Sequence, residues 1–419
     1  MKILVVGGGG REHAIVWKIS QSPKVDKIYC APGNGGIADL AECVDISATD
    51  IENMVKFAKD KEIDLVMVAP DDPLVMGMVD AMEKEGIRAF GPRANAAIIE
   101  GSKAFSKELM KKYNIPTAGY EVFTDSSAAI KYIKEQNSFP TVIKADGLAL
   151  GKGVIIAQNL EEAETAIHEM IDDGKFGKSG SRVVIEEFLT GPEVSVLAFT
   201  DGKTVKPMVS AQDHKRAYDN DEGLNTGGMG TFSPSRLYDD SKAKECMENI
   251  FLPTIKAMAA EGRPFKGVLY FGLMMTQNGV KVIEYNCRFG DPETQVVLPR
   301  LKTDLVDIME AVIDERLDEI DIEWEDNAAV CVVMASGGYP VSYKKGFEIT
   351  GLDNVGDLTV FHAGTAIKDG KIVTNGGRVL GVTAVGKDLD EAIKNAYEGV
   401  GKISFEGEFH RSDIGIKKY

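Results

Sequence analysis

Residues 140–157 read PTVIKADGLALGKGVIIA. Two short runs rich in β-branched residues flank a loop that contains three glycines and a lysine, and a second lysine ends the first run: Gly147, Gly151, Gly153, Lys152 and Lys144. Backbone N–H groups can approach an anion closely where side chains are absent, and lysine adds positive charge. The segment therefore predicts two strands joined by a flap over phosphate groups. A long hairpin loop with glycines at its turns is the alternative.

This glycine loop does not match the Walker phosphate loop. The pattern GxxxxGK[ST] requires four residues between its glycines and a hydroxyl after the lysine. Here three residues separate Gly147 from Gly151, and Gly153 follows Lys152. The next segment has the pattern of a strand rather than a helix, so any ATP chemistry here must belong to a different nucleotide-binding fold.

Length and composition are those of an ordinary globular protein. The chain has 419 residues and 44 glycines, enough for two to four domains at roughly 150 residues each. No run of about 18 apolar residues occurs, so we expect no membrane span. The N-terminus begins directly with a strand and shows no signal-peptide organisation. Five scattered cysteines without CxxC spacing favour a reducing, cytoplasmic setting with neither disulfides nor structural zinc.

The net charge of −17 argues against nucleic acid or another polyanion as a partner. If the substrates are anionic, basic residues must be concentrated locally. Each lysine or arginine beside a glycine is therefore more informative here than it would be in a basic protein.

The N-terminal segment predicts an α/β nucleotide-binding unit. A buried-type strand at Lys2–Val6 runs into four glycines and then an amphipathic helix. The dinucleotide pattern GxGxxG fails in either register, because Glu12 or His13 stands where its third glycine belongs. A dinucleotide site is therefore not expected. An anion at the start of the helix, near Gly10, remains open.

Strands and helices alternate through about the first hundred residues. The later predicted elements are Ile51–Lys61 (helix), Asp64–Ala69 (strand), Leu74–Glu85 (helix) and Arg88–Phe90 (strand). This alternation predicts a doubly wound parallel sheet. The loops at 7–11, 32–36 and 70–73 follow its strands and should converge on a ligand crevice, although one of the three is expected to be only a turn.

A strand that ends in acidic residues predicts a hinge between two lobes. The run from residue 182 leads to Glu186 and Glu187, and Glu193 follows a glycine. Such a hinge can pair its backbone with a purine edge while a carboxylate accepts from ribose hydroxyls. The alternative is an exposed strand end with surface acids, which is the stronger reading for Glu187. Lys103, at the start of an earlier helix, could reach a phosphate.

A polar stretch from Gln212 to Pro234 is too long for a hairpin turn. Loops of this length inside compact domains are usually functional. His214 has no second histidine nearby and suits a structural hydrogen bond as well as a catalytic role.

A predicted hairpin near residue 280 carries a candidate metal site. In its second strand the period of two puts Val282, Glu284 and Asn286 on one face. Two oxygen ligands side by side suit magnesium, which uses few protein ligands together with substrate phosphates. Arg288 follows and could neutralise charge that develops during acyl or phosphoryl transfer. A polar strand end and turn is the alternative.

The character of the chain changes near residue 327. A buried strand, glycine-rich loops and a last helix predict a small α+β domain. Arg378, which follows Gly376 and Gly377, is its best candidate for contact with an anionic ligand.

Taken together, these stretches resemble the ATP-grasp superfamily and, within it, the phosphoribosylamine–glycine ligase family. The motifs that carry the resemblance span the chain in order: GGGGREHA (7–14), APGN (31–34), EGSKAF (100–105), VIKADGLALGKGV (142–154), VIEEFL (184–189), SAQDHKR (210–216), NTGGMG (225–230), EYNCRFGDPETQ (284–295), SGGYP (336–340), HAGT (362–365) and TNGGRVLGVTA (374–384). DHKR, NTGGMG and NCRFGDPETQ together make it strongly specific.

The resemblance implies an α/β architecture of three domains. They are an N-terminal doubly wound domain (1–101), a two-lobed ATP-grasp domain (102–326, with a lid lobe at about 122–191) and a C-terminal α+β domain (327–419).

The implied reaction joins glycine to 5-phospho-β-D-ribosylamine at the expense of ATP. Glycine would first form glycyl phosphate, which the amine of phosphoribosylamine would then attack to give glycinamide ribonucleotide, ADP and phosphate in purine synthesis. Phosphoryl transfer depends mostly on positioning and charge neutralisation, which suits the residues present.

The resemblance also implies roles for individual residues. ATP would be bound by Lys103, Lys144, Gly147, Gly151, Lys152, Gly153, Glu186, Glu187, Phe188, Leu189 and Glu193. Glu284 and Asn286 would bind Mg²⁺ or Mn²⁺, while Arg288 and Lys144 would act in catalysis. Substrate contacts would come from Gly10, Asp71, Asp213, Lys215, Arg216, Arg288 and Arg378.

One motif departs from the family pattern. Residues 69–74 read APDDPL where GPEAPL or GPEDPL is expected. Asp71 keeps the acid but shortens it by one methylene, so the role carried over to it is in question.

Other functions remain open from the sequence. A related grasp enzyme could activate bicarbonate or formate, a nucleotide-binding regulator could have lost turnover, and a dehydrogenase could use the N-terminal turn. We expect a cytoplasmic monomer that acts on small molecules, binds neither nucleic acid nor membrane, and associates at most weakly with other enzymes of the purine pathway.

Overall fold

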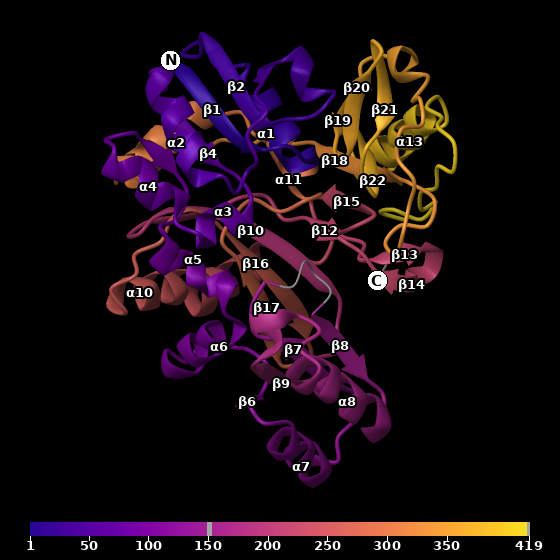
Figure 1. The fold of residues 1–419 in the computed structure, drawn as a ribbon. Helices are drawn as coiled ribbons and strands as arrows, with labels where there is room; N and C mark the ends of the chain where they lie inside the picture. The colour runs from indigo at the N-terminus through magenta and orange to yellow at the C-terminus, as the bar shows by residue number, and fades with distance from the viewer. Residues whose placement is uncertain (149–152, 417–419) are drawn as a thin grey trace.

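The computed structural model describes residues 1–148 and 153–416. Figure 1 shows the N-terminal and C-terminal segments side by side at one end, a small lid sheet at the other end, and a central sheet between them. Within the described residues, no helix has both the length and the apolar character needed to cross a membrane.

The N-terminal sheet is parallel with the strand order β3-β2-β1-β4-β5. Its strands are β1 (Lys2–Gly7), β2 (Lys27–Pro32), β3 (Glu42–Cys43), β4 (Leu65–Val68) and β5 (Ala89–Phe90). The order reverses between β1 and β4, and α/β sheets bind ligands at such a switch point. The predicted doubly wound sheet is confirmed.

Helices cover this sheet, and one of them differs from the prediction. The helices are α1 (Gly10–Ile19), α2 (Ile51–Asp60), α3 (Asp71–Val75), α4 (Met78–Lys84) and α5 (Ala94–Gly101). The single helix predicted over Leu74–Glu85 is wrong, because Gly77 adopts a left-handed φ of 92° between α3 and α4. Glycine reaches this conformation without steric cost. The break lets α3 begin at Asp71, directly after β4.

The central sheet has the order β11-β10-β16-β17. Its strands are β10 (Glu193–Asp201), β11 (Val205–Pro207), β16 (Lys266–Thr276) and β17 (Gly279–Asn286). The associated helices are α6 (Lys103–Lys112), α9 (Asp240–Cys246), α10 (Leu252–Ala260) and α12 (Leu305–Ile313), whereas the short helix α11 (Thr294–Val297) packs against α1 and the C-terminal sheet. Apolar side chains from this sheet and from the N-terminal sheet share one core, so the two regions pack as a unit.

The lid is a separate antiparallel sheet with the order β6-β9-β7-β8. It comprises β6 (Tyr120–Phe123), β7 (Thr141–Ala145), β8 (Val154–Ala157) and β9 (Val183–Glu187), with α7 (Ser126–Gln136) and α8 (Leu160–Ile167). Its apolar side chains form their own small core. The two strands predicted around the glycine loop are β7 and β8, whereas Gly151 and Lys152 lie outside the described residues.

The C-terminal sheet has the order β12-β15-β18-β22-β19. Three strands belong to the last segment: β18 (Ala328–Ala335), β19 (Thr359–His362) and β22 (Arg378–Gly386), packed against α13 (Leu389–Val400). The other two strands, β12 (Gln212–Asp213) and β15 (Gly230–Ser233), come from the middle of the chain. The hairpins β13 (Arg216–Tyr218) with β14 (Glu222–Asn225), and β20 (Thr365–Lys368) with β21 (Lys371–Thr374), lie outside this sheet. The polar stretch at 212–234 is thus anchored in the C-terminal sheet.

Two buried histidines join the N-terminal and C-terminal segments. The His362 backbone N–H donates to His13 Nδ1 at 2.8 Å, and both side chains are buried. Burial lowers the pKa of His13 to about 3 and that of His362 to about 4. Both rings are therefore neutral at pH 7, and protonation of His13 would remove the acceptor that holds this interface.

We expect this interface to make the protein sensitive to acid. Because the folded-state pKa values lie below the ordinary value, the unfolded chain binds more protons between about pH 6.5 and pH 4. The stability contributed by each neutral histidine is complete above pH 6.5 and falls by about 2 kcal/mol by pH 5.

Urea unfolding at pH 7 and pH 5 measures this effect. His13→Asn, which keeps an acceptor but cannot be protonated, should lose about 2 kcal/mol less between the two pH values than the parent protein does. His168→Gln, at an exposed site, is the control. An unchanged pH dependence in His13→Asn would contradict the prediction.

Candidate active site

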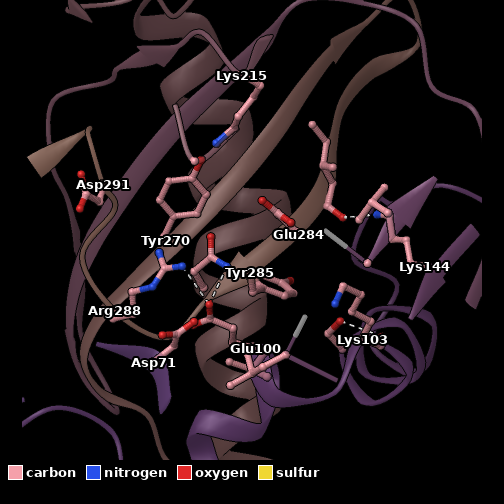
Figure 2. Close-up of a pocket in the computed structure, with 18 of the residues that line it drawn as sticks. Asp71, Glu100, Lys103, Lys144, Lys215, Tyr270, Glu284, Tyr285, Arg288 and Asp291 are labelled. Carbon is pink, nitrogen blue, oxygen red and sulfur yellow. Dashed lines mark hydrogen bonds and ion pairs between the residues drawn. The ribbon is translucent and has the colours of Figure 1, made fainter. Parts of the chain in front are cut away.

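A cavity of about 290 Å³ lies where the four regions meet. Its basic lining residues are Arg11, Lys103, Lys107, Lys144, Lys215, Arg288 and Arg378, and its acidic ones are Asp71, Glu100, Glu186, Glu284, Asp291 and Glu293. Figure 2 shows the labelled members of this set pointing toward one another. A chain with a net charge of −17 thus places seven cationic side chains around this cavity, as anionic substrates require.

On the lid side, one buried carboxylate holds two lysines. Lys144 Nζ and Lys107 Nζ each lie 3.1 Å from Glu186, and Lys107 also donates to Thr117 Oγ1 at 2.7 Å. Burial lowers the pKa of Lys107 to about 8, although Glu186 opposes this shift. Burial alone would raise the pKa of Glu186, but the two lysines outweigh it and lower that pKa. Lys107, Lys144 and Glu186 together carry a net positive charge on the side of the cavity next to the lid sheet.

Lys103 stands at the first turn of α6, beside the base of the glycine loop. Its Nζ donates to the Gly147 carbonyl at 3.0 Å. Asp146 accepts from Ser102 Oγ at 2.9 Å and forms an ion pair with Arg182, which ties the start of α6 to the lid. Burial lowers the pKa of Lys103. The Lys103 ammonium group has acidic side chains only at a distance. A bound phosphate would give it a direct charge partner.

Strand β17 presents the predicted metal ligands, but not through strict alternation. The pairing with β16 skips Ile283, which is therefore a β-bulge. The prediction that Val282 shares a face with Glu284 and Asn286 is wrong for this reason. Val282 and Tyr285 belong to the apolar core, whereas Glu284 and Asn286 line the cavity. The bulge lies just before the two polar residues, and it reverses which face of the strand is buried.

Glu284 and Asn286 fit a divalent cation. Among the described residues, the Glu284 carboxylate has no hydrogen-bond or ion-pair partner, and Figure 2 shows it between Lys103 and Lys144 on one side and Arg288 on the other. The same residues contain no cluster of three His, Cys, Asp or Glu side chains that could hold a metal. A carboxylate and an amide oxygen, completed by phosphate oxygens and water, match the habits of Mg²⁺.

Arg288 lies beside this pair, its side chain 17% exposed, and is held by Glu100. Its Nη2 lies 3.0 Å from Glu100 Oε1, and its Nη1 donates to the Phe289 carbonyl at 3.3 Å. Burial opposes the charged form, but Glu100 and Asp71 raise the pKa of Arg288 above its ordinary value. Arg288 is therefore a fixed cation within the cavity lining.

A second acidic and basic cluster lies on the opposite wall. Lys215 Nζ is 2.8 Å from Asp213, and the buried Glu293 accepts from Tyr270 OH at 3.1 Å and from Ser195 Oγ at 3.3 Å. Burial opposes the charge on Lys215, but Asp213 and the neighbouring groups raise its pKa well above the ordinary value. Burial raises the pKa of Glu293. This wall can hold both an amine and a carboxylate.

Arg378 joins the NTGGMG loop to the cavity. Its Nη1 donates to the Gly227 carbonyl at 3.0 Å and to the Asp291 carbonyl at 2.9 Å. Tyr339 OH accepts from the Gly227 N–H at 3.0 Å. Burial alone would raise the pKa of Asp291, but Arg378 and Arg11 lower it. The C-terminal region thus supports the loop and also lines the cavity.

Several predicted site residues lie elsewhere. Arg216 donates to the Gly223 carbonyl inside the β13–β14 hairpin and is not part of the cavity lining, so its substrate contact stays a prediction. Gly10 packs against the side chain of Gln295 and is not part of the cavity lining, and Glu12 caps this helix end by accepting from the Gly9 N–H at 2.6 Å. The Glu12 carboxylate therefore already occupies the helix end at which an anion was predicted to bind near Gly10.

The predicted adenine and ribose residues lie from the end of β9 to the start of β10. Glu186 lines the cavity, whereas Glu187, Phe188, Leu189 and Glu193 form or flank the link between β9 and β10. Gly153 lines the cavity from the start of β8. These nucleotide contacts remain predictions.

The sequence did not reveal every charged group of the site. Glu100, Lys107, Asp291, Glu293 and Arg11 all line the cavity but were not predicted as site residues. Four of them fall inside or beside motifs already noted. Lys107 lies one helical turn after Lys103, so a helical spacing of four was the available signal.

A small lid sheet and a central sheet border one cavity, which is lined by lysines of the lid and α6 and by carboxylate and amide oxygens of β17; this arrangement is that of an ATP-grasp enzyme. Family models match the chain as the N domain (residues 1–100), the ATP-grasp (A) domain (101–294) and the C domain (329–417) of phosphoribosylglycinamide synthetase. The chain belongs to the phosphoribosylamine–glycine ligase family.

Individual relatives agree with this assignment. A phosphoribosylamine–glycine ligase of Caldanaerobacter subterraneus is 53% identical over 414 residues, which cover 99% of each chain. The crystal structure of the phosphoribosylamine–glycine ligase of Thermotoga maritima has a TM-score of 0.86 and 34% identity, covering 99% of this chain and 100% of that one. The biotin carboxylase domain of Hydrogenobacter thermophilus 2-oxoglutarate carboxylase, solved with MgADP, has a TM-score of 0.73 over 98% of this chain and 91% of that one; at 16% identity it shows the fold alone.

Proposed function

We propose that this protein joins glycine to 5-phospho-β-D-ribosylamine, using ATP, to give glycinamide ribonucleotide, ADP and phosphate in purine synthesis. The observation that carries the proposal is the unpaired Glu284 carboxylate among fixed cations, in a cavity lined by all three segments that match the family. An ATP-dependent ligase needs this combination of a metal ligand and charge-neutralising groups.

The lid residues hold the nucleotide in this proposal. Lys103 and Lys144 bind the ATP phosphates, and the loop from Gly147 to Gly153 closes over them. Glu186 to Leu189 line the adenine, and Glu193 accepts from the ribose. Because Lys107 also pairs with Glu186, that carboxylate stays neutralised when Lys144 turns toward a phosphate.

Glu284 and Asn286 would hold Mg²⁺ or Mn²⁺ with the phosphate oxygens of ATP. Such an ion supplies charge neutralisation of the phosphates and orients the γ-phosphoryl group for in-line transfer. Glu284 fits this role since no described residue pairs with it.

The chemistry has two steps. A carboxylate oxygen of glycine attacks the γ-phosphorus of ATP, and ADP leaves as glycyl phosphate forms. The amine of phosphoribosylamine then attacks the carbonyl carbon, the C–O bond to phosphate breaks, and the amine gives up a proton. Arg288 stabilises the negative charge that develops in both steps.

The acceptor substrates occupy the wall opposite the lid. Lys215 and Arg378 are suited to the phosphate and carboxylate groups, while Asp213 and Asp71 are suited to amine and hydroxyl groups. Asp71 begins α3 at the end of β4 and lines the cavity, so the shortened acid still reaches the site.

The rival function is activation of bicarbonate, as in the carboxylases that share the fold. Their similarity to this chain does not extend to sequence, at 16% identity. The 53% identity to a phosphoribosylamine–glycine ligase over nearly the whole length supports glycine instead.

Coupled ADP release tests this function. Release should require ATP, glycine and phosphoribosylamine together, and it should fall to background when glycine or phosphoribosylamine is omitted. Bicarbonate and formate, each in place of glycine, are the controls. ADP release with either control acid and none with glycine would refute the proposal.

We also propose that the protein is a cytoplasmic monomer. Its five cysteines are free, which suits a reducing compartment. The substrates are small molecules, and neither a nucleic acid nor a membrane is required.

A further inference from the structure

Glu100 is a buried acid that the reaction outlined above does not use. It lies near the end of α5, only 7% exposed, and it also lines the cavity. Its carboxylate accepts three hydrogen bonds from three consecutive residues, the last residue of β17 and the two that follow it. The donors are Asn286 Nδ2 at 3.0 Å, the Cys287 N–H at 2.7 Å and Arg288 Nη2 at 3.0 Å. One carboxylate thus holds the whole turn that carries the candidate metal ligand and the candidate catalytic arginine.

The bond to Asn286 decides which way its amide faces. The oxygen and nitrogen of an asparagine amide have nearly the same shape, so only the surrounding hydrogen bonds fix their positions. Because a carboxylate only accepts, the Nδ2 atom must face Glu100. The amide oxygen then accepts from no described residue and is left for the cavity that Asn286 lines.

The bond to Arg288 fixes the second functional group from the same atom. Glu100 Oε1 accepts from both Asn286 Nδ2 and Arg288 Nη2. The guanidinium group and the amide group are therefore both held by one oxygen, and Figure 2 shows Glu100 beside Arg288. Groups that hold a ligand in one orientation commonly change metal affinity by about 10- to 100-fold when removed.

We propose that Glu100 is a positioning residue of the ligase site, which turns the Asn286 amide oxygen toward the metal and holds Arg288 beside it. This inference rests on the proposed assignment of Asn286 as a metal ligand. Glu100 itself touches neither metal nor substrate.

The test measures Mn²⁺ binding to the full-length protein in the presence of a non-hydrolysable ATP analogue, using the electron paramagnetic resonance signal of free Mn²⁺. Glu100→Gln should weaken Mn²⁺ binding by about tenfold, because glutamine can offer its own N–H to Asn286 and let the amide turn. Binding of the analogue in EDTA should change less than about twofold. Glu108→Gln, on the exposed face of the neighbouring helix α6, is the matched control and should bind Mn²⁺ as the parent protein does.

Exchanging the acid and the amide between positions 100 and 286 separates a positioning role of Glu100 from a merely structural one. Asn286→Asp alone places two carboxylates together and should bind Mn²⁺ weakly. The double variant Glu100→Gln with Asn286→Asp restores a hydrogen bond of opposite direction and presents a carboxylate oxygen to the cavity, so its Mn²⁺ affinity should recover relative to Asn286→Asp. This comparison holds even if Glu100→Gln alone folds poorly.

Any one of three results would overturn the inference. Folded Glu100→Gln could bind Mn²⁺ within twofold of the parent protein, the double variant could show no recovery, or the parent protein could bind no Mn²⁺. The readout needs neither glycine nor phosphoribosylamine. Failure of the ADP-release test would therefore refute the proposed function without deciding the role of Glu100, and normal turnover with unchanged Mn²⁺ binding in Glu100→Gln would refute only this inference.

Discussion

Replacing Arg288 with alanine is expected to lower kcat by about 10³-fold while the KM for ATP changes little. Arg288 is partly buried and is held by Glu100 and the Phe289 carbonyl, so it lines the cavity in a fixed position. A prepositioned cation acts mainly where negative charge develops in the transition state, and its loss therefore appears in kcat. Steady-state ADP release over a range of ATP concentrations measures both constants.

Arg288→Ala is also expected to lower the free energy of unfolding, and this effect must be measured separately from the fall in kcat. Without Arg288, the buried Glu100 loses its charged partner, and we expect the free energy of unfolding to fall by about 3 kcal/mol. Arg288→Lys keeps the charge and should recover stability, yet it lacks the two-nitrogen fork and should remain impaired in kcat. Full activity in folded Arg288→Ala would contradict the assignment.

The N-terminal fold was predictable from local sequence. The apolar strands, the glycine turn after Val6 and the alternation with helices predict the doubly wound sheet, and the sheet has that topology. Gly77 marked the break between two helices, but the helical periodicity around it predicted one continuous helix. Its left-handed conformation splits one predicted helix into α3 and α4, and a glycine inside an amphipathic pattern gives only a weak signal of such a break.

The C-terminal sheet could not be assembled from local patterns. Strands β12 and β15 are short and come from a glycine-rich stretch about a hundred residues before β18. Their pairing depends on long-range register, for which the sequence carries no periodic signal. The prediction that the stretch at 212–234 is functional rested on its length, its polarity and the motifs DHKR and NTGGMG, and the structure adds that Arg378 and Tyr339 support it.

Within the site, groups near glycines or at strand ends were easier to predict than buried partners. Lys103, Lys144, Glu284, Asn286 and Arg288 all line the cavity as their motifs suggested. Which acid would pair with Arg288 was not visible in the sequence, because Glu100 is 188 residues away. The bulge in β17 was equally hidden, since a bulge changes the alternation without changing the residue types.

The Glu284 carboxylate is kept free of the chain's own cations. Two neighbouring acids of the cavity have cationic partners, Glu186 in Lys144 and Glu100 in Arg288. Glu284, which lies between these pairs, has no ion-pair partner among the described residues. This separation keeps a metal ligand available, while Glu186 and Glu100 fix the lysines and the arginine.

This arrangement leads to a second large effect, at Glu284. Glu284→Gln should lower kcat by about 10³-fold, equal to about 4 kcal/mol of transition-state stabilisation, and should weaken Mn²⁺ binding in the presence of a non-hydrolysable ATP analogue. Because no ion pair is lost, the midpoint of thermal unfolding should stay the same or rise, in contrast to Arg288→Ala. Metal titration, steady-state kinetics and thermal unfolding of the same preparation measure the three quantities.

The control for Glu284 is Glu121→Gln, an exposed acid on lid strand β6, which should leave all three quantities unchanged. Loss of activity together with loss of stability in Glu284→Gln would indicate that this carboxylate has a structural partner, and retained Mn²⁺ affinity would exclude it as a ligand. Loss of activity and Mn²⁺ affinity with stability intact is the combination expected of a residue that is held free for its ligand, because functional groups of this kind are costly to the fold until the ligand binds.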